Sequence, residues 1–169
     1  MTLFFVAGII LLINALQKNN NFFNVRSIFR DQFALFKDSP SQYIVFYLVP
    51  LLLAIGSTIL KRVDNTILDN FNIVLSIIIS MLFAFISILT SKDKLSSKGE
   101  AVRNETINTA LFEVVLCVIS LLLSNIYLFG GIFDVPISSE IVSTVLYFLM
   151  FTILLQLFVI LKRIKALNN

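Results

Sequence analysis

Glu113 is the residue in this sequence whose position points most directly to chemistry. It is the one charged side chain in residues 106–130, an apolar run long enough to cross a bilayer. An ionised group inside a membrane span costs roughly 2.5–3.5 kcal/mol on insertion scales, so such a residue needs a partner and marks a functional hypothesis. The next question is which side chains meet this carboxyl group.

Depth along the predicted spans identifies three partners for Glu113. Gln156, Tyr47 and Ser87 each lie a few residues from the same end of the predicted bundle as Glu113. An amide, a phenol and a hydroxyl would allow a protonated carboxyl group to donate a hydrogen bond, because desolvation disfavours its charged form. Gln156 is the preferred partner. Two interpretations stay open: a structural hydrogen bond or contact with a cytoplasmic crevice, and a proton-sensing or ion-handling role.

Small and polar residues repeat at helical spacing within two of the spans. Cys117, Ser120 and Ser124 continue the helical face of Glu113, and Ser76 and Ser80 follow the same rhythm in the second span. We expect both stripes to face the interior of the bundle. Close helix packing is the simpler interpretation, since small residues let backbones approach, and a narrow hydrated path is the alternative.

The composition is that of an integral membrane protein. Hydrophobic residues make up 58% of the 169 residues and charged residues 14%, and the mean hydropathy is +0.95. The chain has no His and a single Cys, so we expect no His or Cys metal site, no disulfide, no Ser-His triad and no cofactor. These features predict a protein that is not an enzyme.

Four apolar runs predict an all-α transmembrane bundle. They cover residues 43–60, 71–90, 107–129 and 141–161 and form one domain over residues 41–169. Residues 1–40 hold a further apolar segment, 3–16, which is short for a span and contains Asn14. Crossing as a fifth span and lying at the interface both stay open for this segment.

The basic residues orient the predicted bundle. Eleven of the thirteen Lys and Arg residues precede the first span, separate the second from the third, or follow the fourth. Lys61 and Arg62 stand on the opposite side. Because short cytoplasmic segments retain Lys and Arg, we expect a bacterial cytoplasmic (inner) membrane protein with a cytoplasmic C-terminus. The positive charge is explained by topology, so nucleic acid is not an expected partner.

Two segments on the predicted cytoplasmic side are candidate contact surfaces. Residues 91–105 mix charges of both signs and predict a solvated loop, a helix extension or a docking surface. Residues 22–37 place aromatic and basic side chains on one amphipathic stripe. The stripe is an interfacial helix against anionic headgroups or a brace for the bundle, and its site residues are Phe22, Phe29, Phe33, Phe36, Arg26 and Arg30.

Several short spans, an amphipathic cytoplasmic segment and no soluble catalytic domain resemble small membrane subunits of bacterial multi-component systems, including anti-phage systems such as Kiwa. The resemblance is one of topology, and it implies a membrane component that acts with a soluble partner. The leading hypothesis is a self-associating membrane sensor, anchor or effector that contacts the lipid bilayer and a cytoplasmic protein. The alternative is a small proton- or cation-coupled transporter or channel that uses Glu113.

Overall fold

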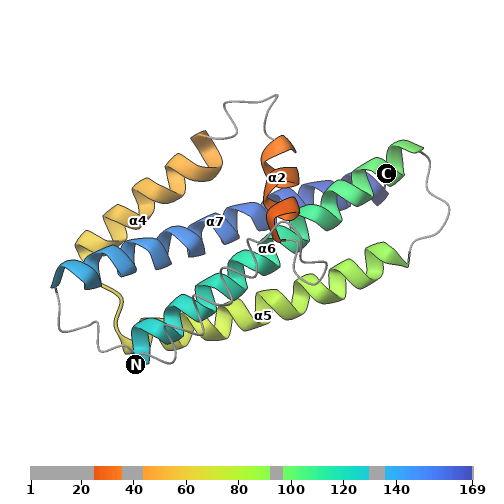
Figure 1. Cartoon of the computed structure of the whole chain (residues 1–169). Coiled ribbons are helices and arrows are strands. Elements are labelled where there is room, and N and C mark those ends of the chain that lie inside the picture. Colours follow the sequence, from red (N-terminus) through yellow and green to blue (C-terminus); the bar gives the residue numbers. More distant parts are fainter. Residues whose placement is uncertain (1–24, 36–43, 92–96, 130–135, 169) are drawn as a thin grey trace.

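The computed structural model describes residues 25–35, 44–91, 97–129 and 136–168, and these segments are almost entirely helical with no strand (Figure 1). The helices are α2 (Val25–Leu35), the π-helix η1 (Ile44–Leu48), α4 (Val49–Leu60), α5 (Asn65–Thr90), α6 (Ser97–Phe129) and α7 (Pro136–Asn168). The predicted all-α class is confirmed for these residues.

Three helices are long and apolar enough to cross a membrane. By length and composition these segments are Asn65–Thr90, Gly99–Phe129 and Ser139–Lys165, with 26, 31 and 27 residues. Ile44–Leu60 is a shorter apolar helix. Its π-helical first turn ends at Leu48, two residues before Pro50, which lacks the backbone N–H that a continuous α-helix requires. Helices long and apolar enough to cross a membrane are thus found at three of the four predicted places.

The two longest helices extend well beyond the predicted spans. α6 begins ten residues before the predicted start at residue 107, and α7 continues seven residues past 161. Hydropathy marks the apolar stretch alone, whereas backbone hydrogen bonds carry a helix on into polar sequence. Residues 97–105 are therefore a helix extension, one of the alternatives predicted for that segment.

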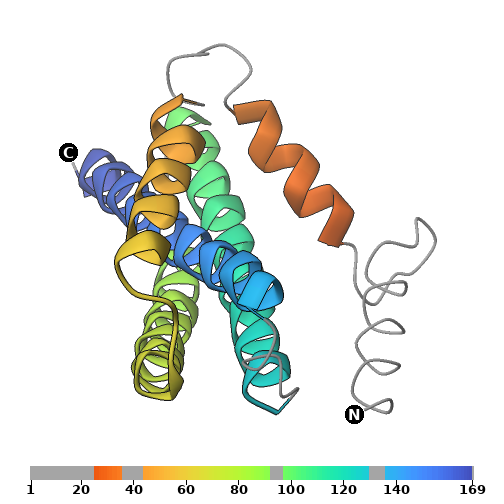
Figure 2. The ribbon, with the colours of Figure 1, turned by 90° about the vertical axis from the view of Figure 1, so that its left-hand side faces the viewer.

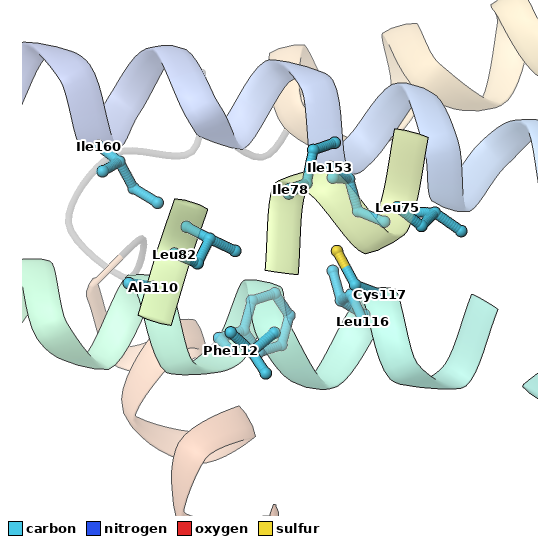
Figure 3. Packing of buried hydrophobic residues seen from close by; sticks show 10 residues of the cluster. Leu75, Ile78, Leu82, Ala110, Phe112, Leu116, Cys117, Ile153 and Ile160 are labelled. Carbon is cyan, nitrogen blue, oxygen red and sulfur yellow. The ribbon is translucent and has the colours of Figure 1, made fainter. Parts of the chain in front are cut away.

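α6 is the centre of the packing. It contacts α5, α7 and α2, while α4 packs along α7, as the view turned by 90° shows (Figure 2). The main hydrophobic cluster joins α5, α6 and α7 through the ten residues Leu75, Ile78, Leu82, Ala110, Phe112, Val114, Leu116, Cys117, Ile153 and Ile160 (Figure 3). A smaller cluster of Val63, Leu68, Tyr127 and Leu146 lies at one end of the bundle. The two ends are called the Tyr127 end and the Arg163 end below.

Charged side chains fix the connection between α4 and α5 at the Tyr127 end. Asp64 caps α5, because its side chain accepts a hydrogen bond from the Ile67 N–H at 2.8 Å. The Lys61 ammonium lies 2.9 Å from the Asp64 carboxylate, and this hydrogen bond is the main cause of a lowered pKa of Asp64. Arg62 pairs with Glu140 and so ties the connection to α7.

Some predictions fall on residues outside the described segments. They are the apolar segment 3–16, the aromatic residues Phe22 and Phe36, and the side chain of Arg26.

Candidate functional site

Glu113 and Gln156 lie in the interface between α6 and α7, which we call the seam. Both side chains are 0% exposed. Two contacts fix the antiparallel register: Arg163 donates to Thr109 at one end, and the Tyr127 and Ser139 hydroxyls are 2.7 Å apart at the other. These contacts bring Gln156 to within about half a helical turn of the level of Glu113.

The polar atoms at this level lack hydrogen bonds within the described residues. Both oxygens of Glu113 and both polar atoms of Gln156 are buried and unpartnered, as is the hydroxyl of Thr152 one turn along α7. Most buried polar groups in folded proteins have a partner, and each one without costs about 1–3 kcal/mol. The seam therefore carries polar groups that reduce the stability of its closed state, as functional sites often do.

One buried face of α6 carries polar side chains along its whole length, whereas the exposed face of residues 107–129 is mostly apolar. Seven buried side chains follow one another along this face: Thr106, Thr109, Glu113, Cys117, Ser120, Ser124 and Tyr127. Around Ser120 and Ser124 the space enclosed with Leu146 and Met150 holds no volume for a water molecule. The seam is thus closed around these two serines in this structure.

The predicted stripe of the second span does not reach the seam. Ser76, Ser80 and Ser87 are exposed on α5, and the hydroxyls of Ser76 and Ser80 donate to carbonyl oxygens of their own helix. The expectation that they face the interior, with Ser87 beside Glu113, is wrong. α5 packs on α6 through a leucine and isoleucine face, which turns its small polar face outward.

α2 lies against α6 at Phe112, the residue that precedes Glu113 in the sequence. Its Phe29 ring meets the ring of Phe112 edge to face, with centroids 4.9 Å apart, and Gln32 is 1% exposed. Figure 3 shows the sulfur atom of Cys117 pointing toward Ile153 of α7. The aromatic residues of α2 thus contact the bundle one residue from the buried carboxyl group.

Tyr47, Phe33 and Arg30, which the sequence also predicted as site residues, lie on or beside α2. Tyr47 of η1 is partly buried and stacks on Phe33, with centroids 6.1 Å apart. Phe33 is 41% exposed, and Arg30 is also exposed. The α2 helix is therefore connected to the start of the α4 segment as well as to α6.

Comparison with protein-family models, with curated proteins and with solved structures finds no match to this chain. The chemistry of the seam therefore has to be read from its own side chains.

Arg163 and Thr109 belong to the site, although the sequence analysis did not include them. One guanidinium N–H donates to the Thr109 hydroxyl at 2.7 Å and to the Glu105 carbonyl oxygen at 3.1 Å. Helical spacing could have identified both residues: Thr109 lies four residues before Glu113, and Arg163 lies two turns after Gln156. Arg163 was overlooked because it follows the apolar run, whereas the helix and its side chain continue along the seam.

The side chains at Glu113 limit the chemistry available there. Within the described segments, no three His, Cys, Asp or Glu residues gather as a metal site would require. A single carboxyl group beside an amide can exchange a proton or bind one hard cation through oxygen atoms.

Proposed function

We propose that this chain is a non-enzymatic multi-pass protein of the bacterial cytoplasmic membrane that acts as a sensor, with α2 passing a signal to the seam. The observation that carries this proposal is the edge-to-face contact of Phe29 with Phe112, one residue from the unpartnered Glu113. Because α2 packs on α6 beside a marginally stable seam, displacement of α2 should change the arrangement of the seam, and a change in the seam should displace α2.

The unpartnered polar groups make a two-state seam reasonable. Each raises the free energy of the closed arrangement, so a modest differential interaction with α2 is enough to shift the seam toward an open arrangement. Segments with unsatisfied buried groups belong to the less stable parts of a fold. Elements that switch between two conformations are found in these parts.

The same proposal covers topology and partners. The segment Ile44–Leu60 forms a fourth span, the Arg163 end faces the cytoplasm, and the C-terminus is cytoplasmic, in accordance with the distribution of Lys and Arg. Exposed Arg30 of α2 and residues 97–105 of α6 offer a charged surface to a soluble protein of a multi-component system, such as an anti-phage system.

Self-association is supported by the outward face of α5. Ser76, Ser80, Ala84 and Ser87 are exposed there at spacings of three and four within the otherwise apolar residues 73–89, and small residues favour close helix contact in a bilayer. The mass of the detergent-solubilised protein measures this association, and a monomer at all protein concentrations would contradict it.

Replacement of Phe29 with alanine tests the sensor proposal through Cys117, the single cysteine of the chain. Cys117 is 0% exposed, so its rate of reaction with a thiol reagent reports opening of the seam. Loss of an aromatic pair worth about 0.5–1.5 kcal/mol should raise the labelling rate in native membranes about 2- to 10-fold.

Phe158→Ala is the matched control, because Phe158 is 68% exposed on α7. The labelling rate of Cys117 in this variant should equal that in the wild type. Labelling of wild-type Cys117 should also rise when the membrane potential is dissipated or the lipid composition is changed. A rate that stays the same in Phe29→Ala and under all such treatments would refute the sensor role.

A second candidate function is coupled transport of a proton or cation, favoured by the complete burial of the Glu113 carboxyl group without a partner. Under this proposal the wild-type protein in vesicles carries a pH-dependent flux that Glu113→Gln abolishes, because the amide keeps the size of the side chain but cannot ionise. Ser80→Ala on the exposed face of α5 serves as control. Equal flux in Glu113→Gln and wild type, or no flux in either, would argue against transport.

A further inference from the structure

The Arg163 end of the seam places a positive charge close to the buried carboxyl group. The guanidinium is held at Thr109, and Thr109 precedes Glu113 by one helical turn, about 6 Å along the axis. The Arg163 side chain is 21% exposed, so the charge lies partly inside the interface.

The direction of the two side chains brings them nearer still. In a helix the Cα–Cβ bond tilts toward the N-terminus. Because α6 and α7 are antiparallel, Glu113 leans toward the Arg163 end, while Arg163 leans into the seam toward the level of Gln156. A rotamer change of the long arginine side chain would move its guanidinium from Thr109 along the seam toward the carboxyl group.

The hydrogen bonds that Arg163 now donates are weaker than a hydrogen bond of the same length to a carboxylate would be. It donates to a hydroxyl and to a backbone carbonyl oxygen, and the nearest Glu105 carboxylate oxygen is 4.0 Å away. A guanidinium forms its strongest hydrogen bonds with a carboxylate in the paired, two-pronged geometry. An ionised Glu113 would thus compete effectively for Arg163.

Other charged or titratable groups around Glu113 are few. α6 itself carries Glu105 and Cys117, α7 carries Arg163 and the exposed Lys162, and α2 contributes the exposed Arg30. The face of α5 that packs on α6 is formed by apolar residues, Leu75, Ile78 and Leu82. Arg163 donates its hydrogen bonds inside the seam, to the Thr109 hydroxyl and the Glu105 carbonyl oxygen.

We propose that the ligand exchanged at Glu113 is a proton, and that Arg163 takes the place of a metal cation as the counter-charge of the ionised carboxylate. In this exchange the carboxyl O–H bond breaks, the proton leaves to water at the Arg163 end, and the guanidinium moves from Thr109 to Glu113. A resident positive charge disfavours binding of Na⁺ or K⁺ at the same carboxylate. The inference deepens the second candidate function by naming its ligand, but it does not require net transport.

Infrared titration of the reconstituted protein tests the proposal. The carboxylic acid band that is absent from Glu113→Gln belongs to Glu113 and should disappear as the pH rises. Its midpoint should be the same in Na⁺, K⁺ and a bulky organic cation. In Arg163→Gln the midpoint should rise by about 1–3 pH units, the effect expected of an opposite charge within about 4–6 Å.

Two further variants keep the test decisive. Thr109→Val removes the hydroxyl that holds the guanidinium in its present place, so the midpoint should fall. Lys162→Gln removes an exposed neighbouring charge and should leave the midpoint unchanged. If Arg163→Gln does not fold, Thr109→Val decides alone.

An unchanged midpoint in Arg163→Gln or in Thr109→Val would overturn the inference, as would a wild-type midpoint that depends on Na⁺ or K⁺. Failure of transport is seen separately, as an absence of flux in a protein whose band titrates with the predicted dependence on Arg163. Flux through Glu113 together with a midpoint insensitive to Arg163 would instead leave transport standing and refute the inference.

Discussion

Replacement of Glu113 with methionine is expected to stabilise the bundle and to abolish its pH-dependent flux. Methionine is similar in length to glutamate and removes two buried oxygen atoms that have no hydrogen-bond partner within the described residues. Exchange of an unsatisfied buried polar group for an apolar one of similar shape should raise the free energy of unfolding in detergent by about 1–3 kcal/mol. Chemical unfolding followed by circular dichroism measures the change.

Glu113→Gln is the matched comparison, because it keeps two polar atoms in the same place and should gain much less stability than Glu113→Met. In both variants the pH-dependent flux and the infrared band should be lost. A substitution that increases stability while it removes activity is characteristic of a site retained for function. A clear loss of stability in Glu113→Met would show instead that the carboxyl group is part of the packing.

The architecture could be predicted from the sequence because hydropathy and helix periodicity are strong, local signals. Three of the four predicted spans are helices long enough to cross a bilayer, and the fourth is a shorter apolar helix. The limits of α6 and α7 could not be predicted in the same way, since their ends depend on backbone hydrogen bonds in polar sequence rather than on apolar composition.

The depth of the site residues along the bundle could be predicted from the sequence, but the rotation of each helix about its own axis could not. Glu113 and Gln156 come to similar levels because each lies a similar distance from the end of its span. Rotation depends on which face of a helix its neighbours cover, and α5 buries leucine and isoleucine against α6 rather than its serines. Ser76 and Ser87 therefore lie outside, although their spacing matches that of the buried stripe of α6.

Arg163 shows a different limit of hydropathy. A long side chain at the end of an apolar run can reach back by about a turn, so Arg163, which lies just after the predicted span, belongs to the interior as much as to the surface. The same reasoning applies to Thr109, whose hydroxyl is bound to both the Glu105 carbonyl oxygen and Arg163. Helical spacing from Glu113 and Gln156 would have found both.

Replacement of Phe112 with alanine is expected to have the largest destabilising effect on this bundle. Phe112 is 2% exposed and belongs to the cluster that joins α5, α6 and α7, and its ring is also the edge-to-face partner of Phe29. Truncation of a buried phenylalanine leaves a cavity and costs about 3–5 kcal/mol in well-packed cores. The same change removes the contact through which α2 is held, so α2 should separate from α6 before the remaining bundle unfolds.

Hydrogen exchange of the backbone amides of α2 distinguishes these two effects of Phe112→Ala. Under conditions where α6 and α7 remain protected, the amides of Val25–Leu35 should exchange faster than in the wild type, and Cys117 should become reactive toward a thiol reagent at the same time. Phe158→Ala, at an exposed site of α7, should change stability by less than about 0.5 kcal/mol and leave α2 protected. Protection of α2 equal to that of the wild type in Phe112→Ala would show that the helix is held elsewhere, and α2 would then lose its proposed role in passing a signal to Glu113.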